Sequence, residues 1–166
     1  NLDVLLNFYK NDTRCLSIAK GITFSTPSTF HLKGLTGSAT QFVLAGVFNQ
    51  KIAAQTNHLV ILKDAEEAAY FHNAFENITN ALDIFYFPSS FKNKKNYQLL
   101  NSSHVMLRTE ALTKLAGTGF GDVAKKVIVT YPEALFEKVV LSKTLTENII
   151  SIKQAESLDV TAMLHK

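Results

Sequence analysis

The stretch Gly34-Leu35-Thr36-Gly37-Ser38-Ala39-Thr40-Gln41 is the part of the sequence that decides the predicted fold. It follows a short β-like run, Thr29 to Leu32, and precedes an apolar helical stretch, Phe42 to Phe48. A strand, a glycine-containing loop and a helix in this order are the context of the nucleotide-binding P-loop, GxxxxGK[ST]. The pattern therefore predicts an α/β domain in which this loop joins a strand to a helix.

The loop lacks the residues that carry nucleotide chemistry in a P-loop. Gly34 matches the first glycine, but Ala39 replaces the second glycine, Thr40 replaces the lysine and Gln41 replaces the hydroxyl residue. The lysine contacts phosphates and the hydroxyl binds Mg²⁺, whereas Thr40 is uncharged and an amide is a poor Mg²⁺ ligand. We therefore expect no catalytic residue, no cofactor, no metal and no ATP hydrolysis. A residual anion site at the helix N-terminus stays open. The positions of this degenerate P-loop are Gly34, Gly37, Ser38, Ala39, Thr40 and Gln41.

Composition places the chain among globular domains. Its 166 residues are 46% hydrophobic, and no run approaches the roughly 18 apolar residues of a membrane span. The 17 basic and 14 acidic residues are interspersed, which argues against a continuous basic surface for nucleic acid. Cys15 is the only cysteine, which excludes an internal disulfide and suits the cytoplasm. Because it has no activating neighbour beyond Arg14 and falls in an apolar helical pattern, we expect Cys15 to be a packing residue. The chain begins with Asn1 and shows no signal peptide, so we expect it to be part of a longer cytoplasmic protein.

Beyond the loop, apolar runs alternate with helical patterns. Asp64 and Glu67 form a capping-box-like start to one helix, and a second helix is expected from about His104 to Ala116. On the first helix, one apolar face is expected from Ala68, Phe71, Phe75 and Ile78. Strands and helices in alternation predict a parallel sheet with helices on its faces. Three short apolar runs are expected to be strands buried on both faces, namely Leu59 to Leu62, Ile84 to Phe87 and Val127 to Thr130.

Both ends of the chain differ from this alternating part. Two helices, Leu2 to Tyr9 and Cys15 to Ile22, are expected to form an N-terminal lid, with Leu5 and Phe8 among the side chains that pack inward. Near the other end, Asn148 to Lys153 suggests a strand, and Asp159 suggests the N-cap of a further helix. The expected organisation is a helical segment over 1–28, an α/β domain over 29–140 and the start of a second domain over 141–166.

Four segments together resemble a known family. They are the degenerate loop, residues 59–69 (LVILKDAEEAA), residues 87–91 (FPSSF) and residues 130–135 (TYPEAL). The chain resembles, from about Phe30 to Lys166, the N-terminal module of bacterial transcription-repair coupling factors. That module is similar to the first domain of the helicase that belongs to the nucleotide-excision-repair excinuclease, and the corresponding loop of that helicase is an intact GxTGSGKT-type P-loop.

The resemblance implies a RecA-like, P-loop-helicase-like parallel sheet that has lost ATP binding, with a second domain inserted from about Leu141. In this family, the inserted domain recruits the damage-recognition subunit of the excision nuclease during transcription-coupled nucleotide excision repair. The module is held against the motor domains of the parent protein, an ATP-dependent DNA translocase that displaces stalled RNA polymerase. The resemblance thus implies a non-catalytic interaction module, and it assigns no partner-binding residue in this chain.

Two other functions remain open from the sequence. One is a true nucleotide-binding enzyme with an unusual loop. The other is a DNA-binding module, because Lys92, Lys94 and Lys95 lie between the aromatic residues Phe91 and Tyr97. In the helicase relative a long DNA-clamping hairpin follows the equivalent strand. The few residues available here instead predict a solvated loop between strand and helix.

Overall fold

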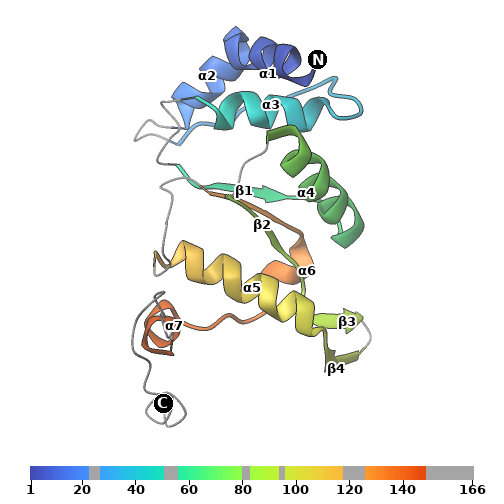
Figure 1. Ribbon diagram of the computed structural model, residues 1–166, viewed down its shortest axis with the longest axis vertical. Helices are drawn as coiled ribbons and strands as arrows, with labels where there is room; N and C mark the ends of the chain where they lie inside the picture. The colour runs from blue at the N-terminus through green and yellow to red at the C-terminus, as the bar shows by residue number, and fades with distance from the viewer. Residues whose placement is uncertain (23–26, 51–55, 80–82, 94–95, 118–125, 149–166) are drawn as a thin grey trace, which may run out of the picture.

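The computed structural model is a mixed α/β structure built on a three-stranded parallel sheet (Figure 1). Residues 1–22, 27–50, 56–79, 83–93, 96–117 and 126–148 are described. The strand order is β1-β5-β2. The sheet strands are β1 (His58–Ile61), β2 (Ile84–Phe87) and β5 (Val127–Thr130). Two of the three predicted strands have the bounds expected from the sequence, and β1 begins and ends one residue early.

Strand β5 lies between the other two strands, and all four of its residues are buried. Strand β1 differs from β5, because His58 and Val60 are only partly shielded from solvent and the residues that alternate with them are exposed. Leu59 and Ile61 are 57% and 53% exposed, so the prediction that β1 is buried on both faces is wrong. As a strand at the margin of the sheet, β1 receives a helical layer on one face only.

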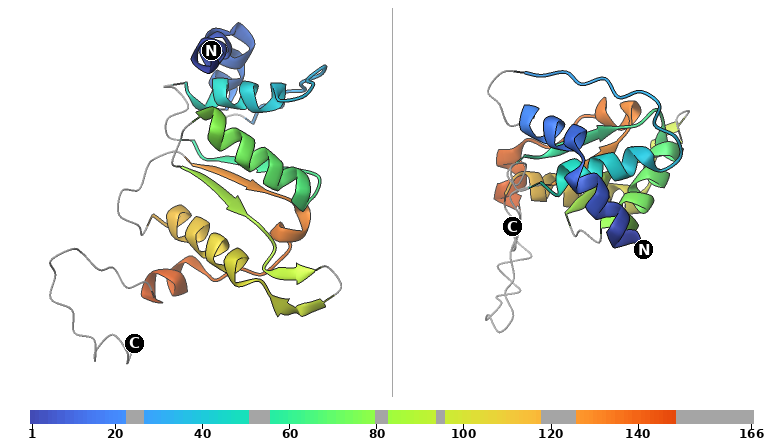
Figure 2. Two further views of the ribbon diagram at one scale, coloured as in Figure 1. Left: turned by 45° about the vertical axis from the view of Figure 1, so that its right-hand side comes forward. Right: turned by 90° about the horizontal axis from the view of Figure 1, so that it is seen from above.

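Helices cover the sheet in two layers (Figure 2). Helices α3 (Ala39–Phe48) and α4 (Ala65–Thr79) lie on one side, and α5 (Ser102–Leu115) lies on the other. The apolar face predicted for α4 is confirmed, since its four residues are buried in the core with Phe48. Those residues are Ala68, Phe71, Phe75 and Ile78.

Local hydrogen bonds explain where the helices begin and end. Asp64 Oδ1 accepts from Glu67 N at 2.9 Å, and Glu67 Oε2 accepts from Lys63 N at 3.1 Å, which confirms the predicted capping interaction. The first of these bonds holds the pKa of Asp64 below its usual value. Helix α5 ends before Gly117, whose positive φ of 71° favours glycine.

Two predictions around the sheet are wrong. Residues 27–33 form no strand, although Thr29 to Leu32 has a β-like sequence, because in the described sheet neither β1 nor β2 pairs with this segment. The segment after Pro88 is not a plain loop. It forms an antiparallel hairpin of β3 (Phe91–Asn93) and β4 (Asn96–Leu100), which projects away from the sheet (Figure 1).

The N-terminal helices α1 (Leu2–Asn11) and α2 (Thr13–Gly21) pack on α3. The predicted inward residues of α1 are wrong, since Leu5 is 42% exposed and Phe8 is 66% exposed. The inward side chains are Leu6 and Tyr9, and the Tyr9 ring stacks on Phe42 with centroids 5.5 Å apart. An error of one position along a helix rotates the predicted face by about 100°.

A small second apolar cluster attaches these helices to α3. It consists of Cys15, Ala19 and Val47, so the prediction that Cys15 is a packing residue is confirmed. Burial raises the pKa of the Cys15 thiol. The thiol is therefore in the neutral, poorly nucleophilic form.

Two further helices follow β5. They are α6 (Pro132–Leu135) and α7 (Ser142–Asn148). The sequence suggests a strand from Asn148, but Asn148 ends α7, and the rest of that run and Asp159 lie outside the described residues. None of the described helices combines the length and apolar character needed to cross a bilayer.

The contact between α1 and α3 gives a test of the packing. A Cβ added at Gly46 would lie 2.8 Å from the Tyr9 carbonyl oxygen and 3.2 Å from Cys15 Sγ. Alanine in a helix interior normally stabilises by about 1 kcal/mol relative to glycine. We expect Gly46→Ala to destabilise the folded protein by about 1–3 kcal/mol instead, because the main chain of Tyr9 must move to make room for the added methyl group. Urea denaturation measures this change.

Asn73→Ala, at an exposed position of α4, is the matched control and should be neutral or slightly stabilising. A gain in stability for Gly46→Ala would show that α1 does not pack on α3 as described.

Candidate functional site

The degenerate P-loop lies at the start of α3, as predicted, but without a strand before it. Ser38 is the N-cap residue and makes no side-chain capping bond. Gly34 and Gly37 have positive φ values of 77° and 54°. The turn is closed by Ala39 N donating to Thr36 O at 3.1 Å. The loop is therefore exposed and shaped by its glycines, and no adjoining strand of the described sheet anchors it.

The side chains that replace the P-loop lysine and hydroxyl lie in different environments. Thr40 is exposed, whereas Gln41 is 5% exposed and its Oε1 atom has no hydrogen-bond partner among the described residues. A Mg²⁺ ligand in a P-loop faces the bound phosphates at the surface. The buried amide of Gln41 belongs to the packing of α3 instead.

A cluster of polar side chains gathers where β2 and β5 end. We name it the turn cluster, and its members are Ser89, Ser90, His104, Arg108, Tyr131 and Glu137. Carboxyl ends of parallel strands are the usual position of ligand sites in α/β sheets. The turn cluster is thus the strongest candidate for a polar site among the described residues.

Arg108 is the centre of this cluster and is 5% exposed. Its Nη1 donates to Pro88 O at 2.8 Å and to Ala134 O at 3.0 Å. Its guanidinium carbon lies 4.0 Å from the centroid of the Phe87 ring. Burial lowers the pKa of Arg108, and nearby Glu137 opposes that shift. The guanidinium therefore joins α5 to the ends of β2 and α6.

Glu137 provides the opposing charge. Its carboxylate accepts from Ser90 N at 3.0 Å and from Ser89 Oγ, and its Oε2 lies 3.6 Å from Arg108 Nη2. Burial alone would raise the pKa of Glu137. The hydrogen bonds from Ser89 and Ser90, together with Arg108, outweigh burial and hold that pKa below its ordinary value.

The remaining members show that this cluster is not a hydrolytic triad. His104 Nδ1 lies 2.8 Å from the Ser89 carbonyl oxygen, so this nitrogen carries the proton and donates. The Ser89 hydroxyl donates to Glu137, and Ser89 N donates to the Tyr131 hydroxyl at 2.7 Å. In a triad the imidazole would accept from the serine hydroxyl. The observed bonds instead fix the turn that leads into the β3–β4 hairpin.

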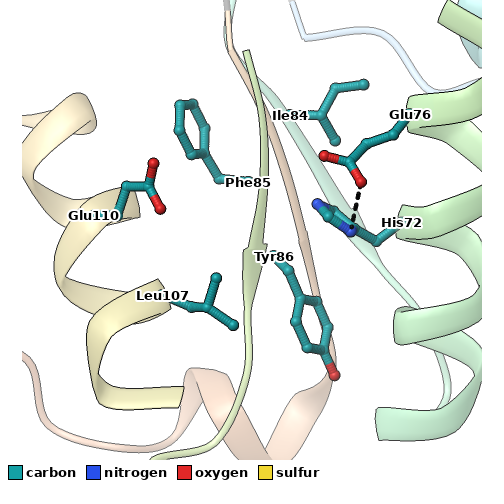
Figure 3. Close-up of a pocket in the computed structure, with 7 residues that line it drawn as sticks. All are labelled: His72, Glu76, Ile84, Phe85, Tyr86, Leu107 and Glu110. Carbon is teal, nitrogen blue, oxygen red and sulfur yellow. Dashed lines mark ion pairs between the residues drawn. The ribbon is translucent and has the colours of Figure 1, made fainter. Parts of the chain in front are cut away.

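A second feature, which we name the edge groove, follows β2 between α4 and α5 (Figure 3). Its volume is about 180 Å³. The lining residues are His72, Glu76, Ile84, Phe85, Tyr86, Leu107 and Glu110. His72 Nδ1 lies 3.5 Å from Glu76 Oε2, and burial raises the pKa of Tyr86 to about 12. No sequence pattern indicates this groove, because its residues come from three separate elements.

The structure places one of the three candidate DNA-contacting lysines. Lys92 lies on β3, while Lys94 and Lys95 fall outside the described residues. The proposed contact with nucleic acid therefore stays a prediction. No group of three or more His, Cys, Asp or Glu side chains suited to a metal ion occurs in the described part of the chain.

Comparison of the chain with protein-family models, with curated proteins and with solved structures gives no match.

The exposed loop yields a prediction about nucleotide binding. The double variant Ala39→Gly, Thr40→Lys restores the second glycine and the lysine of the P-loop pattern. We expect no Mg²⁺-dependent binding of a fluorescent ATP analogue, because the loop still lacks its strand and its metal-binding hydroxyl. Thr40→Arg serves as a charge control for weak, Mg²⁺-independent attraction. Mg²⁺-dependent binding by the double variant alone would contradict this expectation.

The turn cluster yields a prediction about acid stability. Because folding lowers the pKa of Glu137, its stabilisation is complete above the unfolded-state pKa of about 4.3 and is lost as the pH falls through the lower folded value. We expect Glu137→Gln to cost about 1–3 kcal/mol at pH 7. The difference from wild type should shrink below about pH 4.

Urea denaturation across this pH range measures both effects. Glu66→Gln, at an exposed position of α4, is the matched control. A difference between wild type and Glu137→Gln that does not change with pH would mean that the carboxylate is not stabilised by folding.

Proposed function

We propose that this chain is a non-catalytic interaction module of the kind found at the N-terminus of bacterial transcription-repair coupling factors. The observation that carries the proposal is the degenerate loop at the start of α3, within a parallel α/β structure. Its phosphate- and metal-contacting positions hold Ala39, Thr40 and a buried Gln41. A nucleotide-binding ancestry that has lost its chemistry accounts for a loop of this shape and composition.

By this proposal, the sheet is a RecA-like domain over about 29–140, preceded by a helical segment over 1–28. Residues from about 141 begin an inserted domain that recruits the damage-recognition subunit of the excision nuclease. The parent protein is a cytoplasmic, ATP-dependent DNA translocase that acts on stalled RNA polymerase, and this module packs against its motor domains. Its contribution to nucleotide excision repair is recruitment and restraint of the motor.

The bonding of the turn cluster supports a structural role over a catalytic one. Its serine hydroxyl, imidazole and carboxylate are each engaged with the turn after β2, and Arg108 joins them to α5. Rigid positioning of surface elements is what a recruiting module requires. The alternative of a nucleotide-dependent enzyme would need a phosphate-binding lysine and a metal-binding hydroxyl at the loop.

Two measurements test the proposal. The intact chain should show no saturable binding of a fluorescent ATP analogue with or without Mg²⁺, whereas an intact P-loop ATPase assayed in parallel should bind. Deleting residues 1–166 from the parent protein should raise its basal ATPase rate and reduce retention of the damage-recognition subunit. Tight Mg²⁺-dependent binding of the analogue, or a deletion that changes neither property, would refute the proposal.

A further inference from the structure

The edge groove lies along one edge of the described sheet, where Ile84 is buried and Tyr86 is half-buried. Val127 N donates to Asp83 O at 2.8 Å, so the main chain of Asp83 faces β5. In a parallel ladder this direction alternates from residue to residue. The N–H and C=O groups of Ile84 and Tyr86 therefore face away from β5. Within the described sheet, no strand pairs with that side of β2.

The walls of the groove are acidic on both sides. Glu76 comes from α4 and Glu110 from α5, and β2 runs between these helices (Figure 3). The Glu76 side chain is 46% exposed, and Glu110 is also exposed. Asp83, directly before β2, adds a third carboxylate near one end of the strand. The charged and titratable groups that line the groove are thus two carboxylates, the His72 imidazole and the Tyr86 phenol.

The opposite margin of the sheet has a different chemistry. Strand β1 presents exposed Leu59 and Ile61, and the surface near it is lined mostly by apolar side chains. An open edge there would select partners by apolar contact. The β2 edge combines main-chain hydrogen-bonding groups with negative charge. A partner must match both features, so fewer kinds of peptide fit this edge than fit the apolar surface near β1.

We propose that the edge groove binds an extended, basic peptide segment of a partner protein as an added strand beside β2. Main-chain bonds to Ile84 and Tyr86 supply the pairing, as in other cases of strand addition to a sheet edge. Lysine or arginine side chains of the peptide face Glu76 and Glu110, which gives the charge complementarity. An acidic peptide in the edge groove would place its carboxylates beside those of Glu76 and Glu110, and these like charges would repel each other. The residues that line this groove include none of the degenerate loop and none of 141–148.

The probe is a fluorescein-labelled hexapeptide of alternating lysine and valine, titrated into the intact chain at low ionic strength and followed by anisotropy. We expect saturable binding that the matching glutamate–valine peptide does not reproduce. A lysine–valine peptide that is N-methylated at alternate amides should lose binding, because it cannot complete the ladder. Binding that is equal for all three peptides would overturn the proposal, as would no binding of the first peptide at about 1 mM.

Variants locate the peptide. Glu76→Gln combined with Glu110→Gln should weaken binding by about fivefold at low salt, since exposed charge pairs contribute modestly. The control Glu66→Gln lies on α4 outside the groove and should leave affinity unchanged. Unfolding midpoints of both proteins show whether either change acts through stability. Equal affinity of wild type and the double variant would overturn the assignment of the acidic walls.

Amide hydrogen exchange provides an independent readout. On peptide binding, the amides of Ile84 and Tyr86 should gain protection, while those of Leu59 and Ile61 should not. The reverse pattern would place the peptide on β1 and overturn the proposal. Protection of Ile84 and Tyr86 in the peptide-free protein, together with a concentration-dependent increase in mass by sedimentation, would show that a second copy of the chain fills the edge instead.

Discussion

The pairing of β5 with both of its neighbours is the constraint on which the rest of the structure depends. Strands β1 and β2 make no ladder with each other, and each is joined to the sheet through β5. All four β5 residues are buried, so its main-chain groups need these partners. The two helical layers depend on this pairing as well, because they pack on the two faces of the sheet and the sheet is held together by β5.

In the turn cluster, buried polar side chains also need hydrogen-bond partners, as the buried main chain of β5 does. A guanidinium that is 5% exposed would be costly without partners, and Arg108 finds two main-chain carbonyl oxygens, an aromatic face and a nearby carboxylate. Glu137 in turn satisfies groups of the turn after β2. The cluster thus connects the ends of two strands, α5 and the chain after α6, in one network. Its polarity reflects the need to fix a turn at the sheet margin.

Apolar runs and capping residues were sufficient to predict the elements that depend on local sequence. Strands β2 and β5 and the buried face of α4 follow from continuous apolar residues and from the Asp64–Glu67 pair. The other features depend on contacts between residues that are distant in sequence, which local patterns do not show. The β-like run from Thr29 has no partner strand in the described sheet, whereas the polar strands of the β3–β4 hairpin pair with each other. Arg108 and Glu137 lie far apart in sequence, and no local pattern marks them as partners.

The attachment of the N-terminal helices has a consequence for how the molecule opens. Cys15, Ala19 and Val47 form a cluster of their own, separate from the main core, and α1 and α2 make their principal contacts with α3. Elements joined through a small apolar cluster form cooperative units that open at lower free energy than the whole protein. We therefore expect the helical pair to separate from α3 at a lower free energy than the sheet unfolds, and its amide hydrogens to exchange before those of β5.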